Sequence, residues 1–194
     1  MPPLGKRPRL ITVLGLSILL VLSPQFVALE TGIGGASVNN GCNCHSSHAD
    51  ESVILTIAGL PEAFEAGETY VLDISFVGGP DAEGDNQGGF NLKVDRGSLS
   101  AVDETIRIID NSATHTEEGN NQRSWQVEWV APSSDSVVTE FKLLVNSVNG
   151  DSSANSEDRW NILELEVAGV NADSAMNIDI GEPGWLIIIV TILG

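Results

Sequence analysis

Both cysteines and two of the three histidines of the chain lie within seven residues, in the stretch GCNCHSSH at positions 41–48. Thiolate and imidazole side chains bind soft metal ions, attach haem and, in the case of thiols, form disulfides. A single residue separates Cys42 from Cys44, and His45 follows directly. Four interpretations are open at this point: a haem attachment site, a metal site, a disulfide, or a compact loop without special chemistry.

Haem attachment through two thioether bonds normally uses the sequence Cys-x-x-Cys-His, in which the histidine ligates the iron. The stretch in this chain is one residue shorter, so attachment through both Cys42 and Cys44 would distort the loop. A single thioether bond with His45 as the axial ligand is compatible with the spacing. His48 or His115 would then supply the ligand on the opposite side of the haem.

A metal site is the second interpretation, because Cys42, Cys44, His45 and His48 supply four nitrogen and sulfur donors. Four such donors suit tetrahedral zinc or a copper(I) site. Zinc sites usually have two to four residues between their cysteines, so the closer pair favours copper(I). His115, from a different part of the chain, is the candidate that would complete the site.

A disulfide between Cys42 and Cys44 is the third interpretation, because nearby thiols oxidise outside the cell. The ring that it closes is very small, so it removes little entropy from the unfolded chain, and its strain makes it reducible. Such a bond would serve a redox or local-turn role. In the fourth interpretation the polar stretch only covers one edge of the domain, and His48 is an exposed loop residue.

Asp81, Glu83 and Asp85 alternate in the stretch DAEGDNQGG, as ligands do in calcium-binding loops. An EF-hand loop would have glycine at position 86 and glutamate at position 92, where this chain has Asn86 and Leu92. The stretch therefore predicts no more than a loose calcium site. There is no G-x-S-x-G or H-E-x-x-H sequence and no recognisable catalytic triad, so the sequence favours a non-catalytic protein.

The elements that position these residues are expected to be strands, because apolar and polar residues alternate along most of the chain after position 51. The alternating segments are residues 52–58, 69–77, 88–97, 105–110, 123–130, 137–148 and 160–167. Trp125, Trp129 and Trp160 belong to these segments, and we expect them to serve core and sheet packing. Alternation with one wet face predicts antiparallel sheets, and seven or eight such strands predict an all-β, Ig-like β-sandwich.

Both ends of the chain carry segments with a membrane-like composition. Residues 1–29 have three basic residues, Lys6, Arg7 and Arg9, followed by an apolar run, which is the pattern of a signal peptide. Without cleavage, the run is long enough to span a bilayer as a signal anchor. Residues 185–194 are apolar from Trp185 onward and predict the start of a transmembrane anchor, with a terminal core strand as the alternative.

Between these ends we expect a lead-in of residues 30–50, a sandwich of residues 51–169 and a linker of residues 170–184. The lead-in is rich in Gly, Ser and Asn, so hydrophobic burial cannot order it, and we expect its cysteines to fasten it. The net charge of the chain is −18, and all 27 acidic residues fall from Glu30 onward. Such a field repels nucleic acid, which is therefore not an expected partner.

Two motifs are specific enough to suggest a family: GCNCH at residues 41–45, and the pattern THT…W…W-x-A-P at residues 114–132. A third, GLPEAFEAGETY at residues 59–70, is common among sandwich domains. In this order the motifs resemble the exported Reeler-like proteins of prokaryotes, in particular the choice-of-anchor V domain proteins. The resemblance covers about residues 31–168.

The resemblance implies a Reeler-type β-sandwich on a cell surface, with a C-terminal anchor that varies among members. It also implies that Cys42, Cys44 and His45 act as a unit and that His115 lies near a structured corner. It implies no reaction. We therefore expect an exported, membrane-anchored surface domain that binds an unknown surface ligand without catalysis. An extracytoplasmic redox protein that holds copper or haem at the Cys-x-Cys-His element is the alternative.

Overall fold

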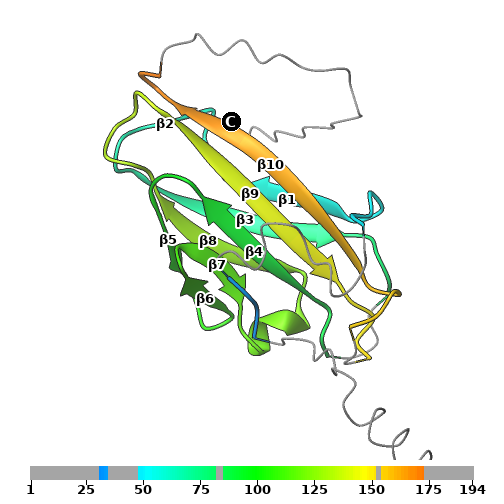
Figure 1. Ribbon diagram of the computed structural model, residues 1–194. Coiled ribbons are helices and arrows are strands. Elements are labelled where there is room, and N and C mark those ends of the chain that lie inside the picture. Colours follow the sequence, from blue (N-terminus) through cyan, green and yellow to red (C-terminus); the bar gives the residue numbers. More distant parts are fainter. Residues whose placement is uncertain (1–30, 35–47, 82–84, 152–153, 173–194) are drawn as a thin grey trace, which may run out of the picture.

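Two β-sheets packed face to face make up the computed structural model, which describes residues 31–34, 48–81, 85–151 and 154–172 (Figure 1). Sheet A contains β1, β3, β8 and β5 in spatial order, and sheet B contains β2, β10, β9, β4, β7 and β6. The strands are β1 (Ile54–Ala58), β2 (Ala63–Phe64), β3 (Thr69–Val77), β4 (Gly88–Val94), β5 (Ser98–Ala101), β6 (Ile106–Ile109), β7 (Ser112–His115), β8 (Ser124–Val130), β9 (Val138–Ser147) and β10 (Arg159–Gly169). A short 3-10 helix, η2 (Glu118–Asn121), follows β7.

Antiparallel pairing dominates both sheets, and among the described strands only β2 and β10 run parallel. The longest ladder joins β9 to β10, from Ser147 opposite Arg159 to Val138 opposite Ala168. β4 pairs with β9 on one side and with β7 on the other, so it lies inside sheet B. The all-β sandwich predicted from the alternation is confirmed.

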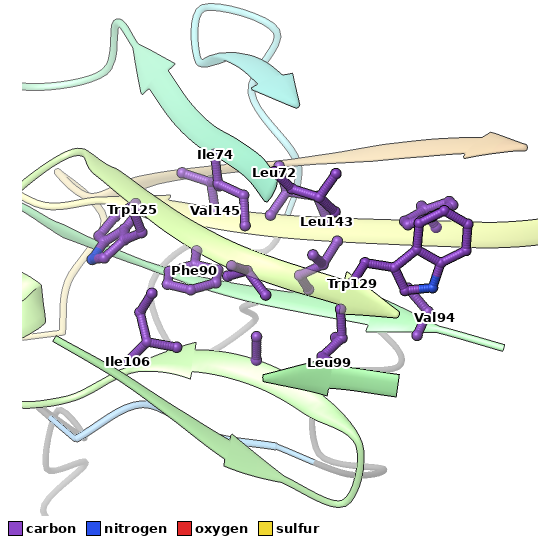
Figure 2. Packing of buried hydrophobic residues seen from close by; sticks show 14 of the residues in the cluster. Leu72, Ile74, Phe90, Val94, Leu99, Ile106, Trp125, Trp129, Leu143 and Val145 are labelled. Carbon is purple, nitrogen blue, oxygen red and sulfur yellow. The ribbon is translucent and has the colours of Figure 1, made fainter. Parts of the chain in front are cut away.

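The core lies between the two sheets and is built from the faces that the alternation predicted (Figure 2). In sheet A the buried residues of β3 and β8 are Leu72, Ile74, Phe76, Trp125, Val127 and Trp129. In sheet B the buried residues of β4 and β9 that face them are Phe90, Leu92, Val94, Phe141, Leu143 and Val145. Removing each large side chain from water stabilises the fold by about 1.5–3 kcal/mol.

Trp129 is the largest fully buried side chain, with none of its surface exposed. Its ring stacks on Tyr70 at a centroid distance of 5.5 Å and meets the edges of Phe64 and Phe141 at 5.4 and 4.8 Å. Its indole Nε1 donates a hydrogen bond of 3.2 Å to the backbone oxygen of Arg96. The aromatic contacts thus join strands of both sheets at one end of the core.

Three short strands, β2, β5 and β7, were not predicted. β7 lies in the polar stretch NSATHTEEGNNQ, which is outside the alternating segments predicted as strands. Its hairpin with β6 turns at Asp110 and Asn111, which both have positive φ (49° and 56°). Two such residues between strands form the type I′ turn that suits the strand twist. The Asp-Asn pair after an apolar run was therefore the signal in the sequence that could have identified this hairpin.

The outer face of sheet B, which points away from the core, is covered around β4 and β7, whereas Glu164 of β10 is exposed on the same side. Asn91, Thr114 and Leu144 lie side by side on this face, and their exposed fractions are 4%, 0% and 1%. Trp160 is on the same face and is also buried, so it packs on the sheet, outside the central core. Alternation predicted water on this side of β4 and β9, and the prediction is wrong for Asn91 and Leu144.

The outer face of sheet A is open, by contrast. Its side chains come from β1, β3, β8 and β5, and most are small or polar. Thr56, Asp73 and Gln126 on this face are exposed, and Val71 is 46% exposed. Here the alternation of buried and wet residues holds along each strand, as expected for an antiparallel sheet with one solvated side.

The membrane-like segments predicted at residues 1–29 and 185–194 lie outside the described residues. Within the described ranges, no helix has the length and apolar composition needed to cross a bilayer. Past the last strand, Val170 and Asn171 donate backbone hydrogen bonds to Phe64 and Asp135 (3.0 Å each). The first residues of the predicted linker are therefore attached to the sandwich.

Candidate functional site

The residues predicted to carry chemistry are only partly described. Cys42, Cys44 and His45 lie outside the described residues, as does Glu83. His48 is exposed at the start of the segment that leads into β1, and His115 ends β7. Within the part of the chain that the structure describes, no three His, Cys, Asp or Glu side chains are close enough together to hold a metal ion.

Residues 31–34, which precede the Cys-x-Cys-His stretch, are attached to the outer face of sheet B. The guanidinium of Arg107 on β6 donates to the backbone oxygen of Gly32 (2.8 Å) and to Oγ1 of Thr31 (3.3 Å). The side-chain amide of Asn91 on β4 donates to the backbone oxygen of Ile33 (2.8 Å). These contacts cross three strands of the sheet, and they require no cysteine.

Gly32 is essential to this close approach. Its φ is +69°, and a Cβ at this position would lie 2.4 Å from Oγ1 of Thr114 and 2.6 Å from the backbone oxygen of His115. An L-residue with a side chain would therefore be strained and would collide with β7. The glycine allows the backbone of the lead-in to lie directly against the sheet.

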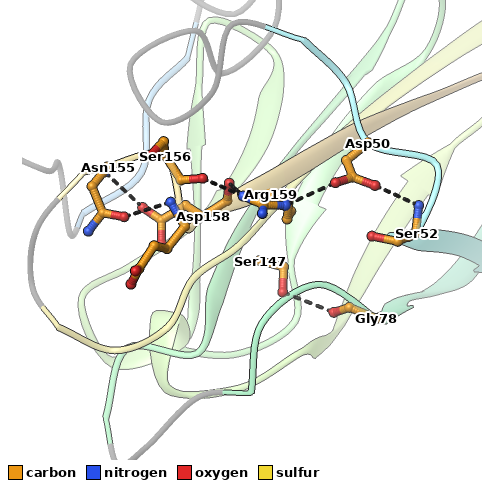
Figure 3. A network of polar contacts seen from close by, with 9 residues as sticks. Asp50, Ser52, Gly78, Ser147, Asn155, Ser156, Asp158 and Arg159 are labelled. Carbon is orange, nitrogen blue, oxygen red and sulfur yellow. Dashed lines mark hydrogen bonds and ion pairs between the residues drawn. The ribbon is translucent and has the colours of Figure 1, made fainter.

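The residues that follow the Cys-x-Cys-His stretch are attached near the opposite edge of sheet B, at the start of β10. The backbone nitrogen of Asp50 donates to the backbone oxygen of Trp160 (2.7 Å), and its carboxylate pairs with Arg159 (3.0 Å). Ser52 also donates to that carboxylate, and this hydrogen bond, followed by the charge of Arg159, lowers the pKa of Asp50 (Figure 3). Residues 35–47 are thus bounded by two fixed points on the same sheet.

The imidazole of His115 lies on this same outer face. A side chain at Gly88 would meet the ring of Phe76 in the core, so one at Gly89 would point outward, and the imidazole occupies that place. Its atoms would lie 2.3–2.8 Å from a Cβ at Gly89. Only a residue without a side chain at position 89 leaves room for the ring.

The peptide of Phe90 fixes the orientation of His115. The backbone N–H of Phe90 lies 3.1 Å from Nδ1, and the backbone oxygen lies 3.3 Å from it. The two contacts assign opposite roles to Nδ1. The oxygen already accepts a 2.7 Å hydrogen bond from Thr114, so we assign Nδ1 as the acceptor from the N–H and place the ring proton on Nε2.

Burial lowers the pKa of His115 from 6.5 to about 4, and the nearby charge of Arg107 acts in the same direction. A hydrogen bond from Nδ1 to the oxygen of Phe90 would oppose the shift, but the neutral acceptor form described above does not make it. The imidazole is therefore neutral at physiological pH. Neutral imidazole is the form that ligates metals.

Two asparagines beside His115 were not predicted as site residues. Asn146 on β9 is directly opposite Gly89, and Asn91 is two residues further along β4 on the same face. The Oδ1 atoms of both side chains are buried and have no hydrogen-bond partner among the described residues. Buried polar atoms without a partner are rare in folded proteins. Nothing in the sequence marks these residues, because asparagine on the predicted wet side of a strand is ordinary.

Asp81 and Asp85, two of the three predicted calcium ligands, are exposed and border residues 82–84, which lie outside the described ranges. The backbone oxygens beside them are bound by an arginine. The guanidinium of Arg123 donates to the oxygens of Gly78, Pro80, Gln87 and Val148, at 2.7–3.5 Å. A protein cation thus holds oxygens of the kind that a calcium ion would use. The calcium site stays a prediction.

The loop between β9 and β10 uses its carboxylates internally (Figure 3). Asp158 is buried, and its two carboxylate oxygens accept from the backbone nitrogens of Asn149 and Asn155, at 3.3 Å each. The side-chain amide of Asn155 donates to Asp151 (2.8 Å). These bonds give the carboxylates a structural role in holding the loop.

The chain has similar folds among solved structures but no match among family models or curated proteins. Among solved structures, it is similar to the reeler domain of human F-spondin, at 17% identity and a TM-score of 0.44, over 62% of this chain and 91% of that one. It is also similar to a conjugative transposon lipoprotein from Bacteroides eggerthii, at 11% identity and a TM-score of 0.35, over 61% and 98% of the two chains.

A cohesin module from a Clostridium perfringens glycoside hydrolase is a third similar structure, at 11% identity and a TM-score of 0.39, over 60% and 96% of the two chains. Reeler domains thus stand among the similar structures, in line with the resemblance seen in the sequence. With every TM-score below 0.5, these likenesses carry no argument about family or function. The prokaryotic family and its choice of anchor stay predictions.

Proposed function

We propose that the chain is an exported, membrane-anchored cell-surface domain with a non-catalytic binding or adhesion role. The open outer face of sheet A is the observation that carries this proposal. It is a broad surface of mostly small or polar side chains, with Ile54, Val71 and Val77 also exposed on it, and nothing described covers it. The signal-like start and the apolar end of the chain support export and anchoring.

Export is tested by adding protease to intact cells that produce the full chain. We expect the sandwich to be degraded from outside while a cytoplasmic marker survives, and the terminal segment to stay in the membrane fraction after alkaline washing. A domain that is cleaved only after lysis would disprove the surface location.

The binding role is tested by reversing charge on the open face. Asp73→Arg places a cation between Ala58 and Gln126 on sheet A, and should weaken adhesion of cells that display the domain. Glu62→Arg makes the same change in charge on an exposed loop outside the sheet and should have no effect. Equal adhesion by both variants and the parent would exclude this face as the binding surface.

A second candidate function is an extracytoplasmic redox or electron-transfer role, with copper or haem bound by Cys42, Cys44 and His45. The observation that favours it is that residues 31–34 are attached to β4 and β6 of sheet B, and Asp50 to β10 of the same sheet. Fifteen residues, 35–49, separate these points, and the stretch with both cysteines is among them. His48 or His115 would provide the further ligand.

The second candidate is tested with the full chain, purified in detergent. Stoichiometric copper, or the Soret band of a haem protein, should be present in the parent and lost in the Cys42→Ser variant. Either result would show that the cysteines hold a cofactor. A colourless, metal-free parent protein with free thiols or a Cys42–Cys44 disulfide would eliminate this candidate.

A further inference from the structure

We propose that β1, an edge strand of sheet A, pairs with an extended, positively charged segment of a partner protein, which adds a further strand to the sheet (Figure 1). In this mode of recognition the main-chain N–H and C=O groups of the two proteins bond to each other, and alternate side chains of the segment contact the domain. The inference rests on the binding role proposed above, because it names the part of sheet A that binds and the chemical class of its partner.

The backbone groups of β1 that face away from β3 belong to Leu55 and Ile57. Phe76 of β3 donates its N–H to the backbone oxygen of Arg123, which precedes β8, so the groups of Phe76 point away from β1. Leu55 is opposite Phe76 in the antiparallel ladder, so its own N–H and C=O point away from β3, as do those of Ile57 two residues further on. Among the described residues, none is hydrogen-bonded to these groups.

The other three edge strands, β5, β2 and β6, are protected against such pairing. On β5, the side chain of Asn111 accepts from the N–H of Leu99 and donates to the backbone oxygen of Gly97, at 3.4 Å each. β2 has only two residues, and β6 carries a charged residue, Arg107. β1 has the five residues ILTIA, without charge or proline. Proteins usually block an exposed edge by such means, so the unblocked edge of β1 is the one suited to accept a strand.

The side chains of β1 leave apolar surface for an added strand to cover. Leu55 and Ile57 point toward the core but are only half-buried, whereas Ile74, opposite Ile57 on β3, is fully buried. On the outer face, Ile54 and Val77 lie opposite each other and are 61% and 62% exposed. A strand beside β1 would remove part of this surface from water on both faces of the sheet, which favours binding.

Charge indicates the class of the partner. The four strands of sheet A contain no lysine or arginine, and their two charged residues are Asp73 and Glu128. Asp73 lies opposite Ala58 of β1, and Glu51 is exposed just before the strand begins. Every basic residue of the described segments lies on sheet B or in a connecting loop. The potential along the β1 edge is therefore negative and attracts a basic segment.

A second copy of this chain is the alternative occupant of the edge, and electrostatics disfavours it. The net charge of the chain is −18, so two copies repel each other. Arg159, at the start of β10, is paired with Asp50 at 3.0 Å and does not offset this repulsion. A segment in which apolar residues alternate with lysine or arginine combines the attraction with cover for Leu55 and Ile57.

Two synthetic peptides test the proposal on the full chain in non-ionic detergent. In one peptide valine alternates with lysine, and in the other valine alternates with glutamate. Fluorescence anisotropy of the labelled peptides should give a Kd below about 1 mM for the lysine peptide and at least about tenfold weaker binding of the glutamate peptide. Sedimentation velocity should show one copy of the chain per particle.

Variants of Ile57 separate strand pairing from attraction between charges. Ile57→Pro removes the outward N–H but leaves the ladder with β3 intact, since proline is tolerated on an edge strand where the N–H faces solvent. Ile57→Ala loses similar packing and keeps the N–H, so it is the matched control, with circular dichroism to verify both folds. Ile57→Pro should bind the lysine peptide about tenfold more weakly than Ile57→Ala.

Thr56 provides a second pair of variants that leaves the core unchanged, because its side chain is exposed on the outer face. Thr56→Lys should weaken binding of the lysine peptide by about two- to fivefold, and Thr56→Glu should strengthen it by a similar factor, since each would lie beside the added strand.

Three results would overturn the proposal: no binding of the lysine peptide at about 1 mM, a preference for the glutamate peptide, or equal affinities of Ile57→Pro and Ile57→Ala. Assembly of the parent into dimers that Ile57→Pro abolishes would assign the edge to a second copy instead. The adhesion assay distinguishes this failure from that of the binding role. Adhesion that Asp73→Arg reduces but Ile57→Pro does not would keep the open face as the binding surface and reject strand addition.

Discussion

The two outer faces of the sandwich differ in a way that the sequence of their strands does not reveal. Both sheets have residues that alternate between the core and the opposite side. On sheet A the opposite side is open, with Val71 46% exposed, whereas on sheet B the corresponding Leu144 is 1% exposed. Periodicity therefore identifies which residues face the core, but it cannot tell whether the other face meets water. Contacts from distant segments decide that.

The core that both faces share should give the largest effect. Trp129→Ala removes a fully buried ring that contacts Phe64, Tyr70 and Phe141, and should cost about 3–5 kcal/mol. Urea unfolding of the variant and the parent, followed by fluorescence, measures the difference. A midpoint equal to that of the parent would mean that the face of β8 has been misassigned.

A matched pair of truncations tests the contrast between the two outer faces directly. Leu144→Ala on sheet B should cost about 2–5 kcal/mol, because it leaves a cavity in a covered face. Val71→Ala on sheet A should change stability by no more than about 0.5 kcal/mol. Similar urea midpoints for the two variants would remove the contrast on which this comparison rests.

His115 should make the stability of the sheet B face depend on pH. Its pKa is about 4 in the folded protein and 6.5 in the unfolded chain, so the unfolded state binds more protons between these values. Stability should therefore fall as the pH decreases from 6.5 to 4, by roughly 2–3 kcal/mol. Thermal unfolding of the parent and of His115→Gln over this range isolates the effect, since the carboxylates titrate in both. Parallel profiles would contradict it.

The smallest effect should come from detaching the lead-in. Arg107→Ala removes the bonds to Thr31 and Gly32 and should lower global stability by less than about 1 kcal/mol. Hydrogen exchange at residues 32–34 should nevertheless become much faster, as measured by mass spectrometry. Arg96→Ala, which loses a bond to Val138 on another part of the surface, is the control and should leave exchange there unchanged.

The fold was predictable where the alternation was long. The faces of β3, β8 and the core side of β4 follow from their sequences because seven or more residues repeat the same period. β2, β5 and β7 contain two to four residues and lie in polar stretches, so they carry too little periodicity to recognise. Their pairing depends on neighbouring strands, which a local pattern does not contain.

The sequence identified His115 as a candidate site residue, but it did not predict which residues surround it in the fold. His115 was noticed because it is one of three histidines, yet its place beside Gly89 depends on a glycine 26 positions earlier in the chain. Asn91 and Asn146 become notable only once the register of β4 and β9 and the burial of their side-chain oxygens are known. The expectation that cysteines alone would fasten the lead-in overlooked Arg107 and Asn91, whose bonds to residues 31–33 join parts of the sequence 58 or more positions apart.

Arg123 has a consequence for the environments in which the domain can keep its shape. Its guanidinium binds backbone oxygens of two loops, the β3–β4 loop and the β9–β10 loop, at one end of the sandwich, and it lies 5.3 Å from the ring centroid of Phe76. A covalently attached cation cannot be washed away by a chelator or diluted in fresh medium. Proteins whose loops are held by bound metal ions lose that order when the ions are removed. In this molecule the Arg123 side chain holds the loops, so their order does not depend on a dissolved ion.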